Sequence, residues 1–232
     1  MAELVDALDS GSSRGNSVDV RVILAAIKPT IAFVAGGSLQ PSALLAAQLN
    51  TYPKVVAVDL GLAYCDQMGI RPDLLVGDFD SVPPHLLLRY KGLPTISCAT
   101  DKDKTDLEIA LEQPFESAVV FGALGGRTDH LLGNITLLSR YPGRLFFVSD
   151  RELLFVIHKK TTLHTHPGQT LSLVPLNGPV TGIITHGLKW PLRHAALDKQ
   201  FLGISNLCLG NSVSISVENG DLLCCLQLHY NQ

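Results

Sequence analysis

The sequence predicts an α/β domain with a parallel sheet, followed by an antiparallel β domain. Two observations lead to this prediction. From residue 31 onward, short apolar runs alternate with helical patterns, an order that places helices on the faces of a parallel sheet. After Arg144 the helical patterns stop, and short strands separated by Gly, Pro and Asn take over. We therefore expect a flexible extension over residues 1–25, the α/β domain over 26–148 and the β domain over 149–232.

Composition indicates a globular protein with reduced thiols. The 232 residues are 46% hydrophobic and 17% charged, which is enough to form a proper core. The net charge of -3, without any basic run, argues against a nucleic-acid partner. We expect neither a membrane span nor a signal peptide, because no apolar stretch is long enough and the first residues are acidic. Five cysteines without CxxC spacing favour a cytoplasmic protein, with Cys224 and Cys225 packed in a strand.

The elements of the first two parts follow in order. The Gly- and Ser-rich run over 11–17 favours a loosely held extension. Short apolar runs then predict strands at 31–35, 55–58, 74–76, 94–97 and 117–121. Amphipathic or Pro-led segments between them predict helices at 41–49, 63–68, 83–90, around 107–111 and at 131–138.

Acidic residues stand where two successive strands end. Asp59 follows the second strand, and Asp78 and Asp80 follow the third. In an extended segment residues two apart point to the same side, so we expect Asp78 and Asp80 to converge while Phe79 turns inward. Such carboxylates, beyond the carboxyl ends of parallel strands, suit Mg²⁺. The alternative is structural, since Asp and Ser81 after a strand also close turns and cap helices.

Two more acids, Asp103 and Asp106, lie three residues apart near the start of the next helix. At that spacing both can face the same side of the helix. The helix dipole favours acids in a first turn, so N-capping is the competing explanation, above all for Asp103.

A glycine-rich turn, Gly122–Gly126, follows the strand at 117–121 and leads into a helix start. Its exposed backbone N–H groups can hold phosphate oxygens, and Arg127 adds a bidentate donor. Asp129 and His130 complete a charged cluster that an ordinary turn does not need. Capping by Asp129 and packing of His130 against the helix are the structural alternatives.

The β domain is expected to contain short strands at 145–148, 153–157, 161–165, 170–174, 180–184, 211–217 and 222–228. His164 and His166 would share one face of a strand, but no third ligand stands at a plausible spacing, so a metal site is not favoured there. Polar, irregular breaks occur at 187–192 and 203–206, the first with the only tryptophan, Trp190. The indole either covers the core or offers an aromatic plane to a cationic ligand.

Taken in order, these motifs resemble the thiamine pyrophosphokinase family. They read Asp59, Gly-Asp78-Phe-Asp80-Ser, Lys102-Asp103-Lys-Thr-Asp106, Gly-Gly-Arg127-Thr-Asp129-His, Gly-Leu-Lys-Trp190 and Ser205-Asn206. The resemblance covers nearly everything from Ile31 onward. It implies a homodimer whose subunit joins a Rossmann-like nucleotide domain to a β-sandwich, with the active site at the dimer interface. It also implies transfer of the diphosphate of ATP to the hydroxyl of thiamine, with Mg²⁺ bound and AMP released.

The resemblance further assigns roles to residues. It implies a catalytic group of Asp78, Asp80, Asp106 and Arg127, in which the three acids bind Mg²⁺. ATP would meet Gly37, Asp59, Asp103, Gly125, Gly126 and Asp129. Thiamine would meet Trp190, Ser205 and Asn206. Two positions depart from the family pattern: Leu60 replaces a glycine of Ala-Asp-Gly-Gly, and Lys102 stands where some relatives, notably eukaryotic ones, carry glutamine.

The expected mechanism is an in-line attack by the thiamine hydroxyl on the β-phosphorus of ATP. Arg127 would stabilise developing charge, and one of the carboxylates would accept the hydroxyl proton. Three other functions compete with this one: a diphosphokinase for another small alcohol such as a pterin, a non-catalytic sensor of thiamine or nucleotide, and a structural assembly module.

Overall fold

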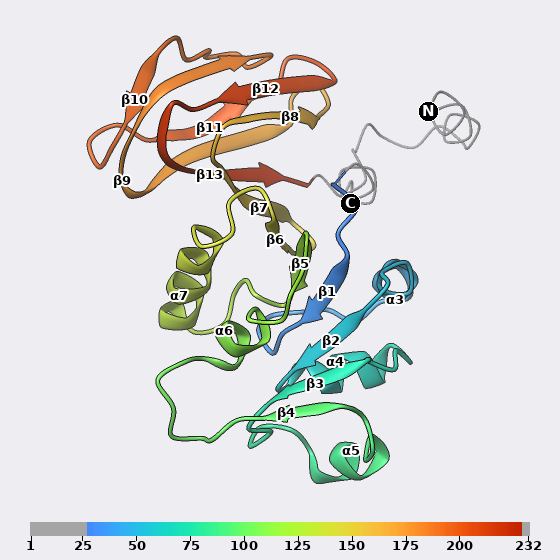
Figure 1. The fold of residues 1–232 in the computed structure, drawn as a ribbon. Coiled ribbons are helices and arrows are strands. Elements are labelled where there is room, and N and C mark those ends of the chain that lie inside the picture. Colours follow the sequence, from blue (N-terminus) through green and yellow to red (C-terminus); the bar gives the residue numbers. More distant parts are fainter. Residues whose placement is uncertain (1–26, 229–232) are drawn as a thin grey trace, which may run out of the picture.

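The structure is a computed structural model that describes residues 27–228. Over these residues a parallel α/β layer continues into an antiparallel β domain, as Figure 1 shows. This arrangement confirms the predicted fold class. The expected extension over residues 1–25 lies outside the described residues.

Six parallel strands form the first half of the sheet, in the order β4-β3-β2-β1-β5-β6. They are β1 (Ile31–Val34), β2 (Val55–Val58), β3 (Leu74–Gly77), β4 (Thr95–Ser97), β5 (Ala118–Phe121) and β6 (Leu145–Val148). All but the edge strand β4 are buried along their whole length. These strands carry apolar side chains on both faces, because helices cover both faces of the sheet. The strand order reverses between β1 and β5, the place where α/β sheets open a crevice.

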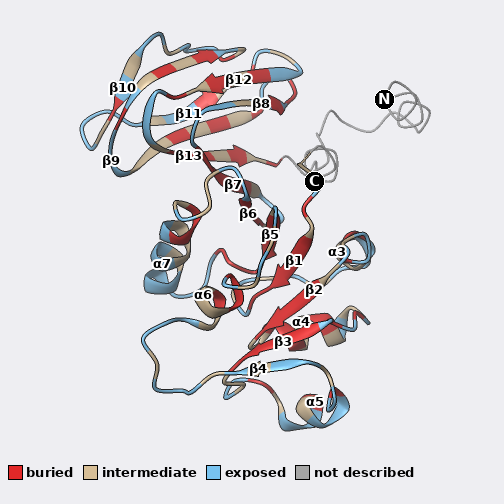
Figure 2. Cartoon of the chain, in the orientation of Figure 1, coloured by how far each residue is buried: buried red, intermediate tan, exposed pale blue. Residues whose placement is uncertain are grey.

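Helices cover the two faces of this sheet, and Figure 2 shows the buried strands between them. They are α3 (Ala43–Leu49), α4 (Gly61–Gln67), α5 (Pro84–Arg89), α6 (Asp106–Ala110) and α7 (Thr128–Leu138). The first three contribute Leu49, Leu62 and Leu86 to one core cluster, whereas α6 and α7 contribute Leu107 and Leu137 to the other. No helix in residues 27–228 is long and apolar enough to cross a membrane.

Capping residues set where two of these helices begin. Ser42 Oγ accepts a hydrogen bond from Leu45 N at 3.1 Å, so α3 starts two residues later than its expected start at Pro41. Thr105 and Glu108 form a reciprocal capping box at the start of α6. The cap of α6 is therefore Thr105, and the capping alternative for Asp103 is wrong.

The second half of the chain is antiparallel throughout. Its strands are β7 (Glu152–Ile157), β8 (Lys160–His164), β9 (Thr170–His186), β10 (Ala195–Leu197), β11 (Gly203–Leu207), β12 (Ser212–Ser216) and β13 (Asn219–Gln227). β9 pairs with β13 and β11 along its first part and with β10 and β12 near its end. β7 pairs with β6, so the sheet runs unbroken across the expected domain boundary at residue 148.

Three expectations for this domain differ from the structure. β9 is one strand where two were expected, because Asn177 (φ 58°) and Gly178 (φ 127°) absorb the irregularity while pairing with β13 continues. β11 lies almost entirely in the stretch 203–206 that reads as irregular, and β10 lies where no strand was expected, since neither has an apolar alternation long enough to predict a strand. His164 is exposed and His166 is buried, so they do not share one strand face.

Candidate active site

A pocket of about 760 Å³ opens where β1, β2 and β5 end. This volume lies within the range of small-molecule sites. The loops after these three strands line it, together with the loop before α6 and the start of α7. It holds these predicted site residues: Gly37, Asp59, Asp103, Asp106, Gly125, Gly126 and Arg127. The other predicted acids of the α/β domain, Asp78, Asp80 and Asp129, are not among the residues that line it.

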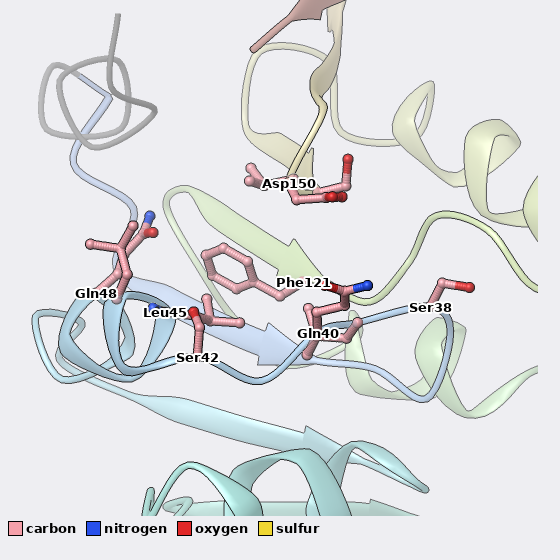
Figure 3. A pocket seen from close by; sticks show the side chains of 11 residues that line it. Ser38, Gln40, Ser42, Leu45, Gln48, Phe121 and Asp150 are labelled. Atoms are coloured by element: carbon pink, nitrogen blue, oxygen red, sulfur yellow. Dashed lines mark hydrogen bonds between the residues drawn. The ribbon is translucent and has the colours of Figure 1, made fainter. Parts of the chain in front are cut away.

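A smaller pocket of about 90 Å³ lies beside the loop after β1 and is drawn in Figure 3. Ser38, Gln40 and Asp150 contribute polar groups, and Leu45 and Phe121 contribute apolar ones. Its volume is far below that of a site for a nucleotide-sized ligand. We therefore assign the chemistry to the larger pocket.

The floor of the larger pocket is backbone packed against backbone. Gly37 N donates to Gly122 O at 2.9 Å, which joins the loops after β1 and β5. A Cβ atom on Gly37 would lie 2.3 Å from that oxygen, so only glycine fits. Tyr64 Oη also donates to Gly37 O at 2.9 Å and ties the loop to α4. A ligand therefore meets a fixed backbone surface here.

Three carboxylates converge beside this floor. Asp59, Asp78 and Asp80 each offer one oxygen, and these oxygens all lie within 4.8 Å of one another. The expected convergence of Asp78 and Asp80 is present, but not through an extended strand, because Phe79 has a left-handed backbone with φ 62°. Asp80 N donates to Asp78 Oδ1 at 3.2 Å and closes this tight turn. Phe79 packs against the core, which is the inward orientation that the sequence predicts.

Asp59 is oriented by a residue that sequence reasoning missed. Ser81 Oγ donates to Asp59 Oδ2, whereas the expected capping role fails because Pro83 caps α5 without a side-chain hydrogen bond. Asp59 Oδ1 is buried and has no hydrogen-bond partner among residues 27–228. A buried carboxylate oxygen without a partner is costly, so Asp59 is suited to a cationic ligand.

Asp106 lies next to this cluster and is joined to it through a lysine. Lys102 Nζ lies 2.9 Å from Asp78 Oδ2 and 3.1 Å from Asp106 Oδ1. The carboxylate cluster of the structure is therefore Asp59, Asp78 and Asp80, while Asp106 is ion-paired. The pKa of Asp78 lies below its usual value, chiefly because Lys102 donates a hydrogen bond to it. Burial lowers the pKa of Lys102, but its hydrogen bonds to both acids outweigh this and raise the pKa overall.

The glycine-rich turn leads into α7 through Arg127, whose guanidinium group is exposed. Gly125 and Gly126 have φ of 78° and 76°, which glycine adopts without strain. Arg127 binds Asp129 in a bidentate pair, with Nε 3.2 Å from Oδ1 and Nη2 2.6 Å from Oδ2. This pair lowers the pKa of Asp129. His130 is exposed and lines the pocket, so the alternative in which it packs against the helix is wrong.

Asn134 is a second pocket residue that sequence reasoning missed. Its Nδ2 donates to Ala123 O at 2.8 Å, which ties α7 to the loop after β5. A single asparagine in a helical pattern carries no signal that distinguishes it from an ordinary polar position. Its role becomes visible only when the loop and the helix are brought together.

The predicted thiamine residues lie in the β domain and do not line this pocket. Trp190 is 54% exposed, with Lys189 Nζ 4.7 Å from the centre of its ring. Asn206 is buried and bonds to the backbone of Trp190 at both of its polar atoms. Ser205 is exposed with φ 61°, and its backbone N–H donates to Ser172 Oγ. The β domain thus presents a separate surface around the tryptophan.

A parallel sheet whose open edge gathers carboxylates, a glycine floor and an arginine defines an α/β enzyme of the phosphate-binding class, here with an appended β domain. Two family descriptions match the chain: "Thiamin pyrophosphokinase, catalytic domain" over residues 45–145, and "Thiamin pyrophosphokinase, vitamin B1 binding domain" over residues 156–222. Together they match more than half of the 232 residues. The chain belongs to the thiamin pyrophosphokinase family, which confirms the resemblance inferred from the sequence.

Individual relatives agree with this assignment. The thiamine pyrophosphokinase of Bacillus subtilis is 30% identical over 79% of this chain and 89% of its own length. Thiamine pyrophosphokinase 3 of rice is 28% identical over 69% of this chain and 68% of its own length. Among solved structures, the thiamin pyrophosphokinase of Geobacillus thermodenitrificans superposes with a TM-score of 0.75 at 31% identity, over 87% of this chain and 98% of that one. The yeast enzyme, at 16% identity and a TM-score of 0.76, shows the shared fold.

Proposed function

We propose that this chain transfers the diphosphate group of ATP to the hydroxyl of thiamine, giving thiamine diphosphate and AMP. The observation that carries the proposal is the convergence of Asp59, Asp78 and Asp80 beside the glycine floor. A binding protein for an anionic nucleotide would gain nothing from three carboxylates at its ligand, since they repel phosphate unless a cation lies between them. The family membership supports the same activity over both halves of the chain.

The residues present fit Mg²⁺. The donor set is made of carboxylate oxygens, the ligands that this ion takes alongside water and phosphate. Asp59 Oδ1, buried without a hydrogen-bond partner in the described chain, is suited to a cation. Asp59, Asp78 and Asp80 would hold the ion, with Asp106 beside them. When bound, Mg²⁺ supplies positive charge to the phosphate oxygens.

The glycine floor and the start of α7 hold the phosphates in this proposal. The backbone N–H groups of Gly125 and Gly126 and the guanidinium of Arg127 donate to phosphate oxygens. Arg127 must then exchange its partner Asp129 for phosphate. This exchange costs little free energy, because both side chains are exposed and exposed ion pairs contribute little to stability. Gly37 and Asp103 line the same pocket and complete the ATP site.

The chemical step is an in-line displacement at the β-phosphorus. The hydroxyl oxygen of thiamine forms a bond to that phosphorus while the bond to the oxygen bridging the α- and β-phosphates breaks. AMP leaves with the bridging oxygen, and a carboxylate of the pocket accepts the hydroxyl proton. Arg127 stabilises the charge that builds on the transferred group.

Thiamine binds at Trp190, Ser205 and Asn206 in this proposal, and the active protein is a homodimer. None of these three residues lines the ATP pocket. Figure 1 shows β10 and β11 at the opposite end of the molecule from β3 and β4. The same domain exposes further large apolar side chains, Phe201, Ile204 and Leu209. A second subunit would cover them and bring its tryptophan to the pocket, so that the active site lies between subunits.

We also propose a cytoplasmic location. All five cysteines are free thiols, which suits a reducing compartment. Burial raises the pKa of Cys65 and of Cys225 to about 12, so these two thiols are unreactive packing groups.

The test measures AMP release from ATP and Mg²⁺, with and without thiamine, for the wild type and for Asp80→Asn. Wild-type AMP release should depend on thiamine, and Asp80→Asn should reduce it about 100-fold or more. The variant should keep the wild-type melting temperature, because Asp80 is exposed. Asp101→Asn, an exposed acid outside the pocket, is the matched control. Thiamine-independent AMP, or full activity in Asp80→Asn, would refute the proposal.

A pterin substrate in place of thiamine is the remaining enzymatic alternative from the sequence. The vitamin B1 binding domain match over residues 156–222 favours thiamine. Running the same assay with a hydroxymethylpterin should give no AMP above background.

A further inference from the structure

Lys102 lines the pocket but has no role in the proposed reaction as described so far. It lies in the loop between β4 and α6, and its side chain is only 16% exposed. Its ammonium group bridges two carboxylates, Asp78 and Asp106, at 2.9 Å and 3.1 Å. Asp78 also belongs to the three-carboxylate cluster. The three acids of this cluster and Asp106 make four carboxylates. In the described chain Lys102 is the one cationic side chain that forms an ion pair with any of the four.

The neighbouring lysine shows that this position is not a general property of the loop. Lys104 is 56% exposed and pairs with Glu112, outside the carboxylate cluster. Lys104 lines the same pocket, but an exposed pair of that kind contributes little to stability and leaves the carboxylate cluster untouched. Lys102, in contrast, is largely withdrawn from solvent, so its charge acts on Asp78 and Asp106 with less screening.

An ammonium group between two carboxylates has the chemistry of a bridging cation. In sites with two metal ions, shared carboxylates hold both ions close together, and the ions together bind phosphate oxygens. The ammonium carries three N–H donors, of which one is hydrogen-bonded to Asp78 Oδ2, while Asp106 Oδ1 lies within ion-pair distance without a hydrogen bond of its own in the described chain. Lys102 also lines the pocket, so its remaining N–H donors can serve a phosphate oxygen there.

We propose that Lys102 is a built-in second cation of this active site: it takes the place of a second divalent ion and positions Asp78 and Asp106. The inference rests on the proposed function, because it requires that Asp59, Asp78 and Asp80 bind one divalent ion. It predicts that the complex with nucleotide holds one fewer divalent ion than it would hold without the lysine. Removing the ammonium frees two carboxylates, and these accept a further ion.

The test counts Mn²⁺ ions bound per chain by electron paramagnetic resonance. The protein is saturated with α,β-methylene-ATP, which binds as ATP does but cannot release AMP. Lys102→Met removes the charge and keeps the length of the side chain. We expect this variant to bind one more Mn²⁺ per chain than the wild type. Lys102→Gln removes the charge but keeps hydrogen bonding, and it is the second uncharged variant should Lys102→Met fold poorly.

Three controls isolate the bridge. Lys102→Arg keeps a cation between the acids and should bind the wild-type number of ions. Lys104→Met removes the exposed neighbouring lysine and should also leave the number unchanged. The double variant Lys102→Met, Asp106→Asn lacks a freed acid and should return to the wild-type number.

Each result then has one meaning. An extra ion in Lys102→Met that disappears in the double variant supports the inference. Equal numbers of ions in the wild type and in both uncharged variants would overturn it, while leaving the proposed function intact. Wild-type protein that binds no Mn²⁺ beyond that of free α,β-methylene-ATP would instead overturn the proposed metal site, and with it the inference.

Discussion

Asn206 holds the backbone of Trp190 at both of its polar groups. Asn206 Oδ1 accepts from Trp190 N at 3.1 Å, and Asn206 Nδ2 donates to Trp190 O at 2.7 Å. Oδ1 accepts a further hydrogen bond from Leu207 N at 2.9 Å. The sequence predicts Asn206 as a thiamine ligand, but in this structure its side-chain amide is engaged in positioning the tryptophan. Besides its place in the proposed thiamine site, Asn206 therefore fixes the position of the indole.

We expect Asn206→Ala to loosen Trp190. Losing the amide leaves partly buried backbone groups unpaired, at a cost of about 1–3 kcal/mol, and should lower the melting temperature by several degrees. The KM for thiamine should rise while the KM for ATP stays constant. Trp190 is the only tryptophan, so its fluorescence reports the change directly. Gln200→Ala removes an exposed side-chain amide of the same domain and is the control. An unchanged emission spectrum in Asn206→Ala would contradict this role.

Lys189 is a second determinant at the same ring. Its ammonium lies 4.7 Å from the centre of the Trp190 ring, in the position of a cation–π partner. Thiamine is a cation, so the lysine repels it and competes for the ring. Lys189→Met should lower the KM for thiamine about two- to fivefold, the range expected for an exposed cation–π contact. Lys199→Met, at an exposed lysine of the same domain, should change nothing. A higher KM in Lys189→Met would mean that the lysine assists thiamine binding.

Arg127 should act in the reaction and not in stability. Arg127→Met removes the bidentate donor, and we expect kcat to fall about 100- to 1000-fold. The melting temperature should stay the same, because Arg127 and Asp129 are both exposed. Arg127→Lys keeps the charge without the planar fork and should recover only part of the rate. Equal rates for the lysine and methionine variants would show that charge at this position does not matter.

The pair of Lys102 and Asp78 should make stability depend on pH in the acid range. The folded pKa of Asp78 lies below its unfolded value of about 3.9. Its contribution is therefore fully present above the unfolded pKa and is lost as the pH falls through the lower folded pKa. Lys102→Met removes the largest cause of this depression and leaves the hydrogen bond from Asp80 N, so the pKa of Asp78 should be lowered less. Acid unfolding, followed by circular dichroism in metal-free buffer, should therefore begin at a higher pH. Lys104→Met should follow the wild-type curve. Superimposable curves for Lys102→Met and the wild type would contradict the coupling.

Much of the fold could be predicted from local patterns. The buried parallel strands read as continuous apolar runs, as in β1 and β5, and the helices between them as amphipathic segments. The same patterns place Asp78 and Asp80 at the end of β3. β10 and β11 could not be found this way, because their pairing with β9 depends on backbone contacts between distant segments.

The sequence predicts most of the residues of the site, but not which of their side chains contact one another. Asp59, Asp78 and Asp106 were identified from their positions after strands or at a helix start. The grouping of these acids depends on contacts between side chains that are far apart in the sequence. Lys102, for example, donates a hydrogen bond to Asp78, 24 positions away. No local pattern carries that information. Ser81 is the same case, because its hydroxyl turns toward Asp59 on another loop instead of capping its own helix.

The proposal that the active site lies between two subunits can be tested by mixing two inactive variants. Asp80→Asn disables the carboxylate cluster of one chain, and Trp190→Ala disables the thiamine surface of the other. Neither variant alone has an intact site. After unfolding and refolding together, half of the dimers are mixed if association is random, and each mixed dimer has one site with both parts intact. Activity should therefore recover to about a quarter of the wild-type value.

This expected recovery depends on the proposed dimer and on one observation in the described chain. The ATP pocket is lined only by residues of the α/β domain, from Ala35 to Asn134, so Trp190 of the same chain does not reach it. If the tryptophan of the partner completes the site, each mixed dimer pairs the intact carboxylates of one chain with the intact tryptophan of the other. If each chain is complete by itself, both chains of a mixed dimer stay inactive, and the mixture shows only the sum of its parents. Refolding each variant separately and mixing afterwards at a temperature that prevents exchange should also give only that sum.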